Sequence, residues 1–129
     1  MDYKGVVIEE SLENKKVLRK IQIISTKVEK VTPKHKTLWL KQWTLHTIKI
    51  PEKKAEQVAE NLSQDLETKH HWYADFKNSK YHYIIYRNKI FKVDLTNPIL
   101  YKDAKKYGIS LGIPSYQVDF TPEDKVWKR

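Results

Sequence analysis

Residues 52–68 carry apolar side chains at intervals of three and four, a spacing that predicts a helix with one apolar face. The stripe consists of Ala55, Val58, Ala59, Leu62 and Leu66. Pro51 stands where a helix can begin, because its missing N–H would lack an intrahelical partner at that position. A single stripe is buried against a single surface, so we expect one sheet to be the partner of this helix.

The N-terminal half of the chain favours strands. The segment Tyr3–Glu9 predicts a short strand with three consecutive β-branched residues at its centre. The segment Val17–Val31 also fits a helical stripe, but it is so rich in β-branched residues that we predict a long strand. Trp39–Ile50 predicts a second long strand, which would form an antiparallel hairpin with the first through a loop around Pro33.

The C-terminal half predicts a three-stranded meander followed by a second helix. The three strands are His71–Phe76, Tyr81–Arg87 and Ile90–Asp94, with turns at residues 77–80 and at Asn88. Asn97-Pro98 opens the helix, Gly112 and Pro114 end it, and its inner face carries Leu100, Ala104, Tyr107 and Leu111.

These elements predict an α+β fold in two layers, with a mostly antiparallel sheet of five to six strands and two helices packed on one face. We expect a single domain over residues 1–120 and a C-terminal tail over residues 121–129.

Composition excludes several classes of protein. The chain has no cysteine, which rules out disulfides, thiol catalysis and cysteine-ligated metals. Its three glycines, Gly5, Gly108 and Gly112, form neither a Walker nor a dinucleotide-binding fingerprint, and we expect no cofactor. Apolar runs are too short to span a membrane, and no signal peptide is evident, so we expect a cytoplasmic protein without membrane contact.

One pair of side chains in the meander could carry chemistry. A four-residue loop at 77–80 would place Asp75 directly opposite His82, close enough for a charge-assisted hydrogen bond. His71 and Tyr73 would share that face, so these four residues are the catalytic candidates. The alternative is a cross-strand pair that only stabilises the sheet. We expect no metal site, because the adjacent histidines at 70 and 71 point to opposite faces.

The same face carries Tyr73, Ile84 and Tyr86, which are too apolar to lie in water. We therefore expect the C-terminal tail or a second subunit of a homodimer to cover it.

The GxSxG pattern at residues 108–112 resembles a nucleophile elbow, but no strand precedes it and no histidine follows it. We interpret Gly108 as a helix-packing residue and Gly112 as a helix cap.

Cations and aromatics alternate in the loop and strand before residue 50. These candidate binding residues are Lys34, Lys36, Trp39, Lys41, Trp43 and His46. With a formal charge of +9, the mixture is typical of a single-stranded nucleic-acid platform, although no RNA-binding signature accompanies it. The alternative is that the lysines are solvated and the tryptophans lie in the core.

Several short motifs, including Trp72-Tyr73-Ala74-Asp75-Phe76 and the Gly-Ile-Pro-x-Tyr-Gln-x-Asp-Phe pattern at 112–120, give the chain a resemblance to known sequences. It resembles a group of small uncharacterised prokaryotic proteins over roughly two thirds of its length. The resemblance implies one domain and implies no activity. Three functions therefore stay open: a non-catalytic binding or regulatory domain for a protein or small ligand, a nucleic-acid-binding module, and a small enzyme using Asp75 and His82.

Overall fold

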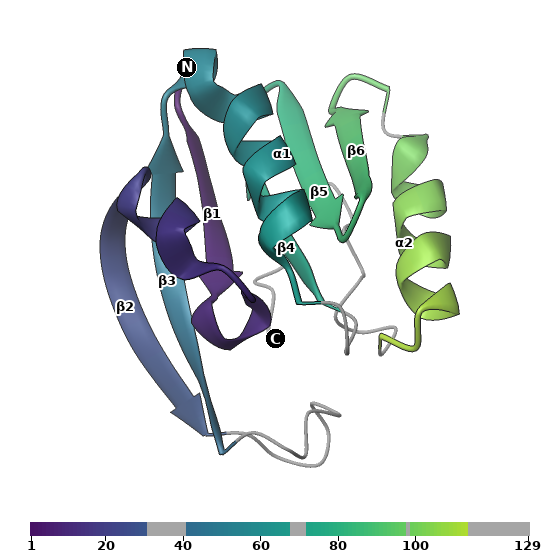
Figure 1. The fold of residues 1–129 in the computed structure, drawn as a ribbon. Coiled ribbons are helices and arrows are strands. Elements are labelled where there is room, and N and C mark those ends of the chain that lie inside the picture. The colour runs from purple at the N-terminus through teal and green to yellow at the C-terminus, as the bar shows by residue number, and fades with distance from the viewer. Residues whose placement is uncertain (31–40, 68–71, 98, 114–129) are drawn as a thin grey trace.

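The computed structural model describes residues 1–30, 41–67, 72–97 and 99–113, and in these residues the chain forms one antiparallel sheet and two α-helices (Figure 1). The strands are β1 (Tyr3–Ile8), β2 (Gln22–Lys30), β3 (Gln42–Ile50), β4 (Tyr73–Lys77), β5 (Tyr81–Tyr86) and β6 (Lys89–Asp94). The helices are α1 (Ala55–Asp65) and α2 (Leu100–Ser110). The six strands lie in the order β2-β3-β1-β4-β5-β6. The predicted α+β class is confirmed.

The ambiguous segment before residue 31 divides into two elements. Residues Lys15–Arg19 form a 3₁₀ helix, η2, and only residues from Gln22 onward form a strand. Strand β2 pairs with β3 antiparallel, which confirms the predicted hairpin between these strands. The loop at 31–40 lies outside the described residues.

The two helices pack against opposite faces of the sheet rather than one face. Helix α1 shares a core cluster with Ala74, Phe76 and Ile85. Helix α2 shares a second cluster with Tyr73, Ile84 and Tyr86. Because successive residues of a strand point to opposite faces, these two sets lie on opposite sides of the sheet.

Helix α2 therefore covers the apolar face that we assigned to the C-terminal tail or a second subunit. Tyr73, Ile84 and Tyr86 are all buried there, and Tyr86 Oη donates a hydrogen bond to the carbonyl of Ala104 (2.7 Å). The inner face of α2 is rotated relative to the prediction, since Tyr101 is buried whereas Leu100 is exposed. The predicted C-terminal tail, residues 121–129, lies outside the described residues, which end at Ile113.

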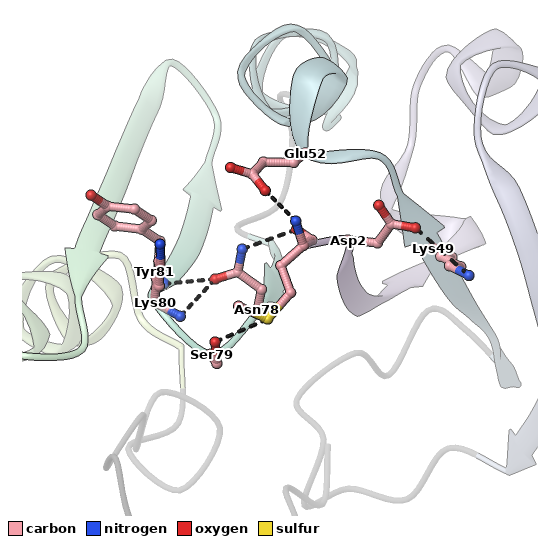
Figure 2. A network of polar contacts seen from close by, with 8 residues as sticks. Asp2, Lys49, Glu52, Asn78, Ser79, Lys80 and Tyr81 are labelled. Atoms are coloured by element: carbon pink, nitrogen blue, oxygen red, sulfur yellow. Dashed lines mark hydrogen bonds and ion pairs between the residues drawn. The ribbon is translucent and has the colours of Figure 1, made fainter.

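The turn between β4 and β5 differs from the predicted turn and sets a different register. Figure 2 shows that Asn78 Oδ1 accepts hydrogen bonds from the backbone N–H groups of Lys80 and Tyr81, both at 2.8 Å. Its amide nitrogen donates to the carbonyl oxygen of Met1 (3.2 Å), so the first residue of the chain holds this turn. The tightened turn lets β4 continue to Lys77, which pairs with His82.

The strands are consequently shifted by two residues relative to the predicted register. Asp75 lies opposite Ile84 rather than opposite His82. A shift of two preserves the face on which each side chain lies, because the side-chain period of a strand is two.

A Schellman motif ends α2, as the glycine pattern indicated. The N–H of Ile113 donates to the carbonyl of Gly108 (3.1 Å), and the N–H of Gly112 donates to that of Ile109 (2.9 Å). Gly112 has a φ of 93°, which suits glycine. No helix in the described part of the chain is both long and apolar enough to cross a membrane.

Candidate functional site

Asp75 and His82 are hydrogen-bonded, although they occupy diagonal rather than opposite positions in the sheet. Asp75 Oδ2 accepts from His82 Nε2–H (2.8 Å). The other ring nitrogen, Nδ1, then accepts from the hydroxyl of Tyr101 (2.8 Å) when the imidazole is neutral. Tyr101 comes from α2, so the cluster joins two strands to a helix that lies more than a dozen residues further along the chain.

This cluster is closed to solvent. Asp75, His82 and Tyr101 are 3%, 1% and 9% exposed. Burial and the nearby Asp75 charge raise the pKa of Tyr101 to about 12, which keeps its hydroxyl a hydrogen-bond donor. The three groups can share a proton among themselves, but they present no surface to a substrate. The arrangement supports the alternative interpretation, a buried polar connection between the sheet and α2.

The other catalytic candidates do not extend this cluster into an open site. Tyr73 is buried in the cluster under α2, where its ring lies 6.2 Å from that of Tyr86. His71 lies outside the described residues.

The candidate nucleic-acid residues do not form an exposed aromatic surface in the described part of the chain. Trp43 is buried, and its ring contacts that of Trp72 edge-to-face at 5.9 Å. Lys41 is exposed, whereas His46 is buried. Lys34, Lys36 and Trp39 lie outside the described residues. A buried tryptophan cannot stack on a base. Of the two kinds of residue that a single-strand platform needs, the described candidates therefore provide an exposed cation but no exposed aromatic ring.

His46 belongs instead to a polar cluster that the sequence did not reveal. Its Nε2 lies 3.0 Å from Glu9 Oε1, and its Nδ1 lies 2.9 Å from Thr26 Oγ1. The three residues come from the 3₁₀ helix η1 (Glu9–Ser11), β2 and β3. Their wide separation in the chain leaves no local signal that could have found them. The cluster attaches β2 to the rest of the sheet.

An open groove lies between α1 and β6, and we call it the α1/β6 groove. Two adjoining hollows of about 240 and 250 Å³ share Glu60 and Ile90. The lining residues come from α1, β5 and β6 with the turn before it: Glu56, Ala59, Glu60, Ser63, Gln64, Tyr83, Asn88, Lys89, Ile90 and Lys92. Each hollow is smaller than the ~300–1,000 Å³ of a typical small-molecule pocket.

The two walls of the groove carry opposite charges. Glu56 and Glu60 lie on the α1 side, and Lys89 and Lys92 lie on the β6 side. No ion pair within the described residues involves any of these four side chains. The ammonium of Lys92 lies 4.3 Å from the centre of the Tyr81 ring, so an aromatic surface already stabilises it. The carboxylates are therefore the charges most available to a ligand.

Among the strands of the described residues, β6 borders the groove and lies at an edge of the sheet. A two-residue turn joins Tyr86 to Lys89, with Asn88 at a φ of 58°. Residues that flank such a turn bond each other, so the ladder directs the backbone groups of Lys89 inward and those of Ile90 and Lys92 outward. Ile90 and Lys92 therefore contribute both their side chains and their outward backbone groups to the groove.

Hydrogen bonds fix the position of α1 relative to β5 and β6 at one end of the groove. Ser63 Oγ donates to the carbonyl of Tyr86 (2.7 Å), and the N–H of Asn88 donates to the carbonyl of Ser63 (3.3 Å). The Arg87 guanidinium donates to the carbonyl of Gln64, in the last turn of α1, and to that of Leu66, the C-cap residue of the helix. The groove is therefore formed before any ligand binds.

Among the described residues, no group of three or more histidine, aspartate or glutamate side chains is arranged to hold a metal ion.

A scan against protein-family models and searches of curated proteins and of solved structures gave no match.

Proposed function

We propose that this protein is a non-catalytic binding domain whose α1/β6 groove takes an extended segment of a partner protein. The observation that carries the proposal is the coincidence of an edge strand with a preformed groove beside a helix. An extended peptide that adds to a sheet edge gains main-chain hydrogen bonds, and adjacent hollows select its alternate side chains.

The dimensions of the groove fit this mode of binding. Alternate side chains of an added strand lie about 7 Å apart on one face. Two small hollows that share two lining residues suit two such side chains better than one compact ligand. Strand addition would use the outward backbone groups of Ile90 and Lys92.

The charges indicate the chemistry of the segment. Ile90 offers apolar surface in the hollow nearer the start of α1, beside the buried Ala59 and Tyr83, where Glu56 and Glu60 form the wall. A bound segment would place an apolar side chain on that surface and a lysine or arginine beside the two carboxylates.

A random ten-residue peptide library displayed on phage tests the proposal. We expect selection on the full chain to enrich peptides with an apolar residue and a basic residue close together. Glu60→Lys would weaken their binding because it replaces the attracting charge by a repelling one, whereas Asp103→Asn, on an exposed position of α2, would not.

Two variants at one position isolate strand addition. Lys92→Pro removes the outward N–H and the charge, while Lys92→Thr removes the charge alone. We expect Lys92→Pro to raise the dissociation constant at least about tenfold beyond Lys92→Thr, the equivalent of one or two lost hydrogen bonds. Failure to select any peptide, or equal binding by the two Lys92 variants, would overturn the proposal.

A further inference from the structure

The opposite edge of the sheet, β2, is unusually exposed for a long strand. All its residues except Glu29 are exposed, and three of them are large β-branched apolar residues, Ile23, Ile24 and Val28. Val28, in the C-terminal half of the strand, is 56% exposed. In the described residues no strand pairs with the outer edge of β2 (Figure 1). Long apolar edge strands pair readily with strands of other chains, so we expect this edge to pair with one.

Part of β2 is regular enough to pair. The β2–β3 register shifts between Ile23 and Ser25, which makes Ile24 the extra residue of a bulge. A bulge hinders pairing where it occurs, but residues 25–30 follow β3 without interruption. The Glu9–His46–Thr26 cluster holds this regular part in place on β3.

We infer that β2 pairs antiparallel with β2 of a second copy of this chain, about a two-fold axis at Val28. In a continuous sheet of two copies the axis is perpendicular to the sheet and passes through one residue position, since directly opposite residues must lie on the same face. Three positions in the middle of β2 are candidates for the axis: Thr26, Lys27 and Val28.

Charge and regularity select Val28. An axis at Thr26 places the bulged Ile24 in the new ladder, and an axis at Lys27 places two lysines directly opposite each other. An axis at Val28 places the two valines opposite each other and each Lys27 opposite Glu29 of the second copy. That register buries the most exposed apolar side chain of the strand and pairs opposite charges on both sides of it.

This inference is independent of the proposed function, because β2 and β6 lie at opposite ends of the strand order formed by the described residues. Pairing through β2 would leave both α1/β6 grooves open, one at each end of the joined sheet. A dimer could then engage two segments of one partner, and its avidity would exceed the affinity of a single groove.

Sedimentation velocity of the full chain tests the inference. We expect a species of twice the chain mass that dissociates on dilution. Val28→Lys would weaken dimerisation at least about tenfold, because two ammonium groups would meet at the axis. Ile109→Lys is the matched control, since Ile109 is also an exposed apolar residue, on α2, and is expected to leave the dimer intact. A wild-type chain that stays monomeric, or a Val28→Lys variant that still dimerises like wild type, would overturn the inference.

A charge exchange tests the register. Lys27→Glu alone would weaken the dimer by placing two carboxylates opposite each other, and Lys27→Glu combined with Glu29→Lys would restore it. If the combined variant is no stronger than the single one, the Val28-centred register is wrong. Peptide binding measured on the Val28→Lys monomer separates the two proposals, because the groove should bind as it does in wild type.

Discussion

At the scale of single residues, the most informative group is the buried Asp75–His82–Tyr101 cluster. A histidine with both ring nitrogens hydrogen-bonded is also found in catalytic sites, but the burial of all three side chains favours a structural role here. Its contribution is to orient α2, because Tyr101 is the member that crosses from helix to sheet. The sequence predicted the Asp75–His82 contact, while Tyr101 was missed because Leu100 was placed on the inner face of the helix.

Removing the Tyr101 hydroxyl should therefore cost stability. We expect Tyr101→Phe to lower the free energy of unfolding at pH 7 by about 1–2 kcal/mol, since a buried ring nitrogen of His82 loses a hydrogen bond. Urea denaturation measures the change. Tyr81→Phe is the matched control: in the described residues the Tyr81 hydroxyl makes no hydrogen bond, so its loss should change stability by less than about 0.5 kcal/mol. Equal effects of the two substitutions would contradict the role assigned to Tyr101.

At the scale of elements, β1 and β4 leave no room for a side chain at Gly5. Gly5 pairs with Phe76, and a Cβ at Gly5 would lie 1.9 Å from the carbonyl oxygen of Asp75 and 2.5 Å from Phe76 Cα. These are backbone atoms that cannot move aside without separating the strands. Strand β1 is central, since it joins β3 to β4, so this glycine keeps the two halves of the sheet together.

Gly5→Ala should separate these strands partly or completely. We expect a loss of about 3 kcal/mol or more in the free energy of unfolding, at the upper end of overpacking effects. Gly112→Ala is a useful comparison, because a Cβ there meets nothing within 4 Å and only the positive φ is unfavourable. That substitution should cost about 1 kcal/mol. Thermal unfolding of both variants checks the order, and a larger loss for Gly112→Ala would contradict the packing argument.

At the scale of the whole molecule, the sheet separates two apolar clusters. Helix α1 covers the larger one and α2 covers the cluster around Tyr86. The second cluster is rich in tyrosine, and burial raises the pKa values of both Tyr86 and Tyr101 well above the ordinary value. Folding therefore holds these two hydroxyls protonated at pH values where the unfolded chain ionises.

Stability should consequently fall in alkaline solution. The folded pKa values lie above the unfolded value of about 10, so this contribution is complete below pH 10 and is lost as the pH rises toward about 12. Over that range each tyrosine steepens the decline by about 1.4 kcal/mol per pH unit. We expect Tyr101→Phe to make the decline shallower by that amount. Urea denaturation at successive pH values measures it, and curves that stay parallel to wild type above pH 10 would contradict the prediction.

Local chemistry determined most of the elements of this protein and the faces of the meander strands. The spacing of Ala55, Val58 and Leu62 defines one helix, and alternation along residues 73–86 defines which side chains share a face, because each pattern depends only on the geometry of its own segment. The predicted face was correct even though the predicted register was wrong, because Asp75 and His82 stay on one face after a shift of two residues.

Only the tertiary structure decided how these elements combine. The Asn78 turn, held by Met1 from far along the chain, sets the β4–β5 register. The choice of face for α2, the partners of His46 and the α1/β6 groove likewise depend on contacts between distant residues. An apolar stripe predicts that one side of a helix is buried. It does not predict which surface covers that side, because the hydrophobic effect is not directional.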